Sequence, residues 1–334
     1  MNILITGGAG FIGSQLYTFL KNKNHQVKLL DNMSDGYYDN ITFNGEITQD
    51  LIEEDIRKVD YNFFDQFDIV VHLAGISALP KCQINPSKAY ENNLSGYANV
   101  LEGCRRSSKV KRIIFSSTSA VYENNKEIPF KENLIINPDL IYSCTKQAGE
   151  ILSKSYANLY QMDIIVSRFF NVYGEHQDIH RSMPPFMSYL AKEIFYQRDP
   201  IVYNKSEAKR DYIHVSDVIE CLYKMITASK TYSGEIYNIC SGIGYSVPDI
   251  LNTFSSVLKI NINPIYSDPS MYWEKFRDLY NYSPISKERL IREVNKNSIG
   301  DPTKTKKEFN FEAKYNFRSG IENIIKYSEK VLSS

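Results

Sequence analysis

Short apolar runs alternate with segments of helical periodicity through the first half of the chain. Residues 2–6 form an apolar run, and beyond a turn Ile12, Leu16, Phe19 and Leu20 recur at helical spacing. Later apolar runs of strand length lie at residues 26–30, 67–75, 110–115, 163–169 and 235–239. Further helical patterns lie at residues 87–106, 142–159, 183–196, 216–227 and 319–332. The alternation predicts an α/β fold, in which helices cover both faces of a parallel sheet.

A glycine-rich turn joins the first predicted strand to the first helix. Gly7, Gly10 and Gly13 follow a G-x-x-G-x-x-G pattern. Unpaired N–H groups and the positive end of the helix dipole therefore face whatever occupies the turn, and a pyrophosphate can approach the backbone closely. Asp31 ends the second strand, where an acid accepts hydrogen bonds from an adenosine ribose. Residues 31–34 offer no Arg or Lys to a 2′-phosphate, so we expect NAD rather than NADP.

The bulk composition excludes several classes of protein. The 334 residues include 39 basic and 39 acidic ones, so no global field favours nucleic acid or an anionic membrane. No apolar run approaches the roughly 20 residues that span a bilayer, and no leader precedes the first strand. The five cysteines form no C-x-x-C pair, which is typical of reduced thiols. We therefore expect a cytoplasmic protein.

Tyr142 and Lys146 lie four residues apart, which places both on one face of the predicted helix. An ammonium near a phenol favours the phenolate, so we expect Lys146 to draw the pKa of Tyr142 down from about 10. Such a pair is common by chance. Here it follows a hydroxyl-rich strand end at residues 116–118 in a chain that opens with the glycine turn.

These stretches together resemble the extended short-chain dehydrogenase/reductase superfamily. Within it, the chain is most similar to the NAD-dependent sugar-nucleotide epimerase/dehydratase family, including UDP-hexose 4-epimerases. The matching stretches follow the family's order at residues 6–13, 30–32, 55–57, 72–75, 116–118, 142–146, 168–174 and 210–215. The resemblance implies a Rossmann-type doubly wound sheet over residues 1–174 and about 209–243. A smaller mixed α/β substrate lobe would take about 175–208 and 244–334, and two helices per subunit (87–106 and 142–159) would form a homodimer.

The resemblance also implies roles for individual residues. Tyr142 would be the acid/base, Lys146 would hold the nicotinamide ribose, and Thr118 would bind the sugar hydroxyl that is oxidised. The NAD site would comprise Gly7, Gly10, Phe11, Ile12, Gly13, Asp31, Asn32, Asp55, Ile56, Leu73, Ala74, Gly75, Asn93, Ser116, Tyr142 and Lys146. The nucleotide-sugar site would comprise Thr118, Asn171, Arg210, Arg292 and Ser298. The two arginines would pair with the diphosphate, whose oxygens match a guanidinium fork; the alternatives are an Arg210–Asp211 ion pair and an ordinary helix charge at Arg292.

The reaction branches after a 4-keto sugar has formed. Epimerases of the family return hydride to the other face of the sugar, whereas 4,6-dehydratases eliminate water and typically carry Asp-Glu after the hydroxyl residue. Here Ser119 and Ala120 follow Thr118, and Glu123 could replace the acid only if its loop folded back. We therefore expect a 4-epimerase of UDP-hexose or UDP-N-acetylhexosamine. A dehydratase, a 4-keto reductase or decarboxylase, and a non-catalytic dinucleotide-binding scaffold are the alternatives.

Three further features allow narrower expectations. The small Ser298 would admit an N-acetyl group on the sugar. The aromatic-rich segment 271–276 is expected to form a packed surface cluster rather than a stacking site. His176 and His180 have the spacing of metal ligands, but no third ligand is evident, so we expect no metal.

Overall fold

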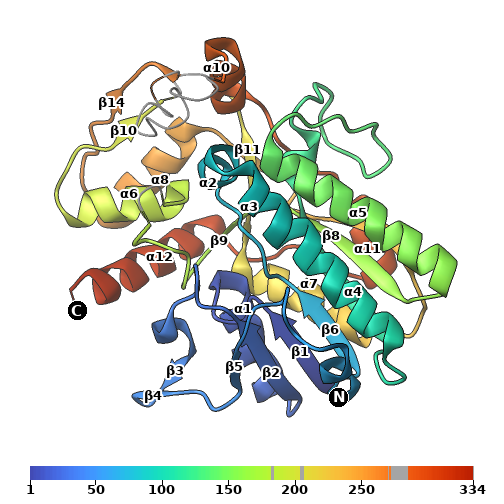
Figure 1. Cartoon of the computed structure of the whole chain (residues 1–334). Coiled ribbons are helices and arrows are strands. Elements are labelled where there is room, and N and C mark those ends of the chain that lie inside the picture. Colours follow the sequence, from blue (N-terminus) through green and yellow to red (C-terminus); the bar gives the residue numbers. More distant parts are fainter. Residues whose placement is uncertain (182–183, 204–206, 270, 272–284, 334) are drawn as a thin grey trace.

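The computed structural model of the chain describes residues 1–181, 184–203, 207–269, 271 and 285–333 (Figure 1). Most of the aromatic-rich segment, residues 272–276, lies outside the described residues, as does Met183 at the start of one predicted helix. Within the described residues, no helix is both long enough and apolar enough to cross a membrane.

A seven-stranded parallel sheet forms the centre of the fold, in the order β12-β8-β7-β6-β1-β2-β5. From β1 the chain builds outward to β2 and β5, then returns to add β6, β7, β8 and β12 on the other side. This reversal between β1 and β6 opens the crevice in which such sheets bind ligands, at the carboxyl ends of the strands. The strands are β1 (Asn2–Thr6), β2 (Gln26–Asp31), β5 (Leu51–Glu53), β6 (Ile69–His72), β7 (Arg112–Thr118), β8 (Ile164–Phe169) and β12 (Ser233–Ile239).

Both faces of this sheet are covered, as the apolar runs predict. Ile3 and Ile5 of β1 join a core with residues of α1 and α7, whereas Leu4, between them, joins a core with residues of α4 and α5. Figure 1 shows α4 and α5 running side by side along one face. The covering helices include α1 (Phe11–Asn22), α4 (Gly96–Arg106), α5 (Ile141–Tyr160), α7 (Val215–Thr227) and α11 (Thr303–Phe309).

A second group of elements has its own apolar core, in which Tyr173, Leu190, Phe254 and Ile324 are buried. Small sheets contribute to it: β9, β11 and β13 form one, and β10 pairs with β14. Their bounds are β9 (Asn171–Tyr173), β10 (Ile201–Val202), β11 (Arg210–His214), β13 (Gly244–Tyr245) and β14 (Ile265–Tyr266). The helices are α6 (Phe186–Phe195), α8 (Val247–Leu258), α10 (Lys287–Asn295) and α12 (Phe317–Leu332).

Several predicted elements differ in extent from the observed ones; the strand predicted at 67–75, for example, is β6, which spans only Ile69–His72. The strand predicted at 110–115 is β7, which continues to Thr118. The helix predicted from 183 begins at Phe186, because the two prolines before it lack amide hydrogens and disfavour helical geometry in the residue they follow. The helix predicted at 87–106 is three segments: α3 (Pro86–Tyr90), a π-helical turn (Glu91–Ser95) and α4. The short β3 (Thr42–Phe43), β4 (Glu46–Ile47) and α2 (Leu79–Ile84) complete this part of the chain.

Candidate active site

The glycine turn packs directly against the end of β6. Gly7 has φ +71°, and a Cβ built on it would lie 2.7 Å from the amide nitrogen of Ala74. A Cβ on Gly13 would overlap the Gly7 carbonyl. Side chains are therefore excluded at both positions. A ligand can approach the backbone of the turn at the N-terminus of α1 without meeting a side chain there. This is the geometry of a pyrophosphate cradle.

The carboxylate of Asp31 fastens this turn to the end of β2. Its Oδ2 accepts a hydrogen bond from the amide of Ala9 at 3.0 Å, and its Oδ1 accepts one from the amide of Met33 at 2.9 Å. Burial raises the pKa of Asp31, and these two hydrogen bonds oppose the rise. Asp31 thus lies beside the turn, where the sequence places an adenosine-binding acid.

The carboxyl ends of β2 and β5 bring together Asn32, Asp55 and Ile56. Asp55 forms an ion pair with Arg57 at 2.6 Å, which lowers the pKa of its carboxyl to about 2. The amide of Asn32 donates to the Asp55 carboxylate at 3.4 Å. Ile56 is buried, and its carbonyl accepts a hydrogen bond from Asn99 of α4. The structure therefore brings together the three residues expected around the adenosine.

Asn93 links the loop after β6 to α5. Its side chain accepts from the amide of Ile76 at 2.7 Å and donates to the Ile76 carbonyl at 3.0 Å and to Thr145 Oγ1 at 3.1 Å. The π-helical turn widens the helix at this point, and such turns are frequent at functional sites. Asn93 therefore holds the loop that contains Gly75, next to which Lys146 lies.

Tyr142, Lys146 and Thr118 meet where β7 ends and α5 begins. The hydroxyl of Thr118 lies near the phenol of Tyr142 and acts to lower its pKa. The ammonium of Lys146, one helical turn on, donates to the Ser116 carbonyl at 2.8 Å. It also lies 3.7 Å from the position of a Cβ built on Gly75. The residues expected to carry the chemistry are thus assembled beside the crevice.

The prediction that Lys146 lowers the pKa of Tyr142 is wrong for the chain on its own. Burial of the phenol raises the pKa of Tyr142 to about 12, and the nearby Thr118 hydroxyl and the charge of Arg181 only partly oppose this rise. Burial also lowers the pKa of Lys146 to about 8. The helical spacing does place the two residues one turn apart. It could not predict that burial has the largest effect on the pKa of the phenol, or that the Lys146 ammonium donates to the Ser116 carbonyl.

Two residues near this group were missed as site residues. Cys82 of α2 is buried and close enough to act electrostatically on both Tyr142 and Lys146, and burial raises the pKa of its thiol to about 12. Arg181 acts on Tyr142 from the loop after β9. Neither residue stands in a motif with recognisable spacing, so no sequence signal identified them.

Three of the expected substrate residues surround β11. Asn171 donates to the carbonyl of Asp211 at 2.7 Å, and the carbonyl of buried Ser298 accepts from the Asp211 amide at 2.7 Å. Arg210 donates to the carbonyl of Glu293 at 2.7 Å. The alternative Arg210–Asp211 ion pair is wrong, because the Asp211 carboxylate instead accepts hydrogen bonds from the amides of residues 241, 242 and 300.

Arg292 is held apart from these three residues. It lies on α10, half exposed, with its guanidinium 3.1 Å from the Asp139 carboxylate. Asp139 stands just before α5, so Arg292 faces the start of the helix that carries Tyr142.

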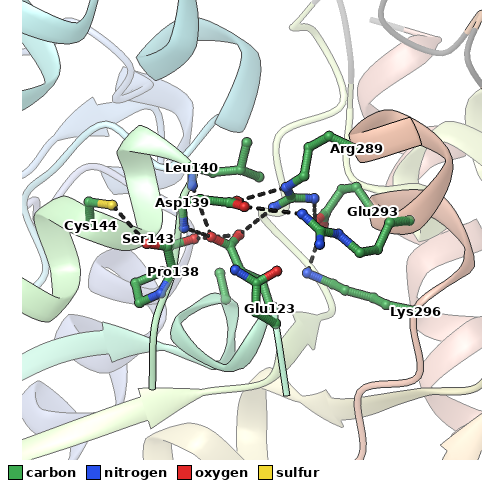
Figure 2. Close-up of polar contacts among 12 residues, drawn as sticks. Glu123, Pro138, Asp139, Leu140, Ser143, Cys144, Arg289, Glu293 and Lys296 are labelled. Carbon is green, nitrogen blue, oxygen red and sulfur yellow. Dashed lines mark hydrogen bonds and ion pairs between the residues drawn. The ribbon is translucent and has the colours of Figure 1, made fainter. Parts of the chain in front are cut away.

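Glu123 does not supply the acid that a dehydratase would need. Its loop does fold back, but onto the start of α5, where the carboxylate accepts hydrogen bonds from the amides of Asp139 and Leu140 and from the Ser143 hydroxyl (Figure 2). Its second oxygen also pairs with Arg289 at 2.9 Å. The carboxylate is therefore fully engaged by the protein itself.

The sequence model of the NAD dependent epimerase/dehydratase family matches residues 3–240. The chain belongs to this family. It is an enzyme, and it uses NAD, which homologous epimerase structures contain. The residues fit that cofactor, because the glycine turn, Asp31 and the ammonium of Lys146 lie at the carboxyl ends of β1, β2 and β7 of one sheet.

Individual proteins show the same relationship. The enzyme is 31% identical over 268 residues to a putative UDP-glucose 4-epimerase of Methanocaldococcus jannaschii, a match that covers 80% of this chain and 86% of that protein. Its fold is similar to that of UDP-N-acetylglucosamine 4-epimerase from Methanobrevibacter ruminantium M1, solved with UDP-N-acetylmuramic acid (TM-score 0.85, 25% identity, 100% and 99% of the two chains covered). UDP-glucose 4-epimerase from Thermotoga maritima, solved with UDP-glucose, is similar too (TM-score 0.84, 26% identity, 99% and 100% covered).

Proposed function

We propose that the enzyme is an NAD-dependent UDP-sugar 4-epimerase that acts through a transient 4-keto sugar. The observation that carries this proposal is the Tyr142 phenol, which lies near Thr118 at the end of β7 and one helical turn from Lys146, in the same sheet as the strand that leads into the glycine turn. In the proposal, residues 1–174 and about 209–243 hold the cofactor, and the remaining residues hold the nucleotide sugar. The UDP-sugars of the similar epimerases support the substrate class.

In this mechanism Thr118 orients the sugar O4 hydroxyl and Tyr142, as phenolate, removes its proton. NAD, which the glycine turn, Asp31 and Lys146 would hold, would supply the hydride acceptor for C4. The pKa of about 12 for Tyr142 in the free chain means that ligands must favour the phenolate. When water is excluded from the closed site, the nearby cationic groups of Lys146 and Arg181 stabilise the phenolate more strongly and so lower the pKa of Tyr142. Tyr142 then gives the proton back to O4 after the keto sugar has turned its other face.

The surroundings of Tyr142 favour epimerisation over elimination. Among the described residues, the side chains that shift the pKa of its phenol are Thr118, Cys82 and Arg181, and none of these is a carboxylate. Dehydration across C5 and C6 needs a second acid and base in contact with the sugar. Glu123 is engaged elsewhere, and residues 119 and 120 are Ser and Ala.

Product stereochemistry tests the proposal directly. Purified enzyme with NAD is incubated with UDP-glucose or with UDP-N-acetylglucosamine, and the products are followed by proton NMR. We expect the C4 epimer without net formation of NADH. We further propose that UDP-N-acetylhexosamine is a substrate, because a small serine stands at position 298 beside Arg210. A 4-keto-6-deoxy product would contradict the epimerase, and turnover of UDP-glucose alone would contradict the role of Ser298.

We also propose a homodimer formed through α4 and α5. The outer face of α5 exposes Ile151 (64%) and Leu159 (71%), which a partner helix would cover. We expect Ile151→Glu with Leu159→Glu to weaken association by at least about 100-fold, since each buried aliphatic side chain contributes about 1.5–3 kcal/mol. Light scattering after size exclusion should then report half the wild-type mass. Ile265→Glu, at an exposed position of β14, should leave the mass unchanged, and a monomeric wild type would contradict the proposal.

A further inference from the structure

Glu123 caps the helix that carries Tyr142 from outside that helix. The N-cap residue of α5 is Leu140, whose side chain cannot accept a hydrogen bond. Instead one oxygen of Glu123 accepts from the amides of Leu140 (2.9 Å) and Asp139 (2.5 Å), and the other accepts from the Ser143 hydroxyl (3.1 Å). A carboxylate at this place satisfies orphan amides and complements the helix dipole. Tyr142 stands two residues beyond Leu140, so this cap fixes the backbone next to it.

Arg289 holds the same cap from α10. Its guanidinium lies 2.9 Å from Glu123, 2.7 Å from Asp139 and 3.1 Å from Glu293, and the residue is only 8% exposed. Figure 2 shows this guanidinium facing the carboxylates of Glu123 and Asp139, with Glu293 and Lys296 on its other side. Arg289 Nε donates a hydrogen bond to Asp139 and Nη1 donates one to Glu293, whereas Nη2 faces Glu123 as an ion pair without hydrogen-bond geometry. The buried positive charge thus holds both carboxylates at the start of α5.

The helix that supplies Arg289 also contacts both arginines expected at the diphosphate. Arg292 belongs to α10 and pairs with the other oxygen of Asp139 at 3.1 Å. Arg210 donates to the carbonyl of Glu293, near the C-terminal end of α10, at 2.7 Å. One short helix thus contacts the start of α5 through Arg289 and Arg292, and it contacts Arg210 through the Glu293 carbonyl.

We propose that Glu123 and Arg289 are positioning residues, which couple the seating of α10 against the nucleotide-sugar diphosphate to the placement of Tyr142. The inference rests on the proposed function and deepens it. When Arg292 turns from Asp139 to the diphosphate, Arg289 keeps α10 attached to the start of α5. Packed elements move as units, so Tyr142 reaches its catalytic position only when α10 is bound to the diphosphate. Binding energy from the diphosphate, remote from the reacting carbon, is in this way used to orient the base.

The test is a substitution that breaks the ion pair while keeping the cap. Glu123→Gln retains an acceptor for the two amides but turns an amide donor toward Arg289. We expect kcat to fall by about 10- to 100-fold, as for other small misplacements of a catalytic group, with NAD content and the KM for the UDP-sugar changed by less than about threefold. Arg289→Gln should have the same effect, and the double variant should be no worse than the stronger single one, because coupled residues are not additive. Arg289→Lys should recover part of the rate.

Lys296→Gln is the matched control, since it removes a 2.8 Å ion pair with Glu293 in the same cluster without touching α5. We expect it to leave kcat within about twofold of wild type, because the ion pair that it removes lies within α10 and its C-terminal flank and does not join α10 to α5. Equal losses in Lys296→Gln and Glu123→Gln, or an unchanged kcat in Glu123→Gln, would overturn the coupling.

A readout that needs no turnover separates this inference from the proposed function. Hydrogen exchange of the amides of residues 144–148 is compared in substrate-free wild type, Arg289→Gln and Lys296→Gln. We expect exchange in the first turns of α5 to accelerate at least about tenfold in Arg289→Gln only. Unchanged exchange would overturn the coupling even in an active enzyme. A wild type that epimerises no UDP-sugar would overturn the proposed function, while the exchange comparison would still decide whether α10 holds α5.

Discussion

The Tyr142→Phe enzyme is expected to lose about 10³-fold in kcat, or roughly 4 kcal/mol of transition-state stabilisation. In the proposed mechanism the phenol takes the proton of the sugar hydroxyl, and the carboxylate nearest to Thr118 in the sequence, Glu123, is already held by Arg289 and the start of α5. The ring itself remains, so packing at the start of α5 should hardly change. We therefore expect the KM for the UDP-sugar and the amount of bound NAD to stay within about threefold of wild type, since uniform binding is kept.

The matched control is Tyr160→Phe, the same chemical change at the exposed C-terminal end of the same helix. It should retain full turnover. Rates are measured by a coupled assay or by NMR, and bound NAD is released and quantified from each variant. Turnover by Tyr142→Phe within a factor of two of wild type would rule out the phenolate mechanism, whatever the substrate.

Local patterns predicted the parts of this fold whose cause is local. The apolar run at 2–6, the glycine turn and the helical spacing after it match β1 and α1 because strand, turn and helix depend on neighbouring residues. The same holds for α5, which was predicted at 142–159 and spans Ile141–Tyr160. The expected family is confirmed by the match over residues 3–240. The site residues follow from these elements, since strand ends of a parallel sheet meet at one edge.

Features that depend on distant contacts were not predictable in this way. The π-helical turn at Glu91–Ser95 accompanies the hydrogen bonds of Asn93 to Ile76, 17 residues earlier. The Glu123–Arg289 pair joins segments that share no pattern in the sequence. The raised pKa of Tyr142 depends on burial, which residue spacing does not report. Sequence thus predicted which candidate groups lie together, whereas their pKa values depend on the packed structure.

The Lys146→Met enzyme is expected to be more stable than wild type and almost inactive. Burial lowers the pKa of Lys146 from 10.5 to about 8, which corresponds to a cost of about 3 kcal/mol for keeping the ammonium charged in the fold. Methionine fills a similar volume without that cost. In the NAD-free protein at pH 7, we expect the free energy of unfolding to rise by about 3 kcal/mol. The loss of a cationic donor from the site should lower kcat by at least about 100-fold.

The difference in the free energy of unfolding between Lys146→Met and wild type should depend on pH. Between pH 8 and 10.5 the unfolded wild type keeps the Lys146 proton that the folded chain has released, so wild-type stability rises with pH in this window. Lys146→Met lacks this contribution. The difference between the two proteins should therefore be largest below pH 8 and should vanish toward pH 10.5. Denaturant unfolding at several pH values measures it, with NAD removed because a bound ligand adds its own stabilisation.

Lys154→Met is the control for a lysine on the same helix, since the Lys154 ammonium donates to the Ser233 carbonyl from an exposed position. Its stability should stay within about 0.5 kcal/mol of wild type at every pH. A Lys146→Met protein that is less stable than wild type at pH 7, or whose difference from wild type does not shrink with rising pH, would contradict the cost assigned to the buried ammonium. If the prediction holds, the enzyme keeps a destabilising charge beside Tyr142 because that charge is needed for catalysis. Selection for catalysis is thus expected to leave the wild-type enzyme less stable than its Lys146→Met variant.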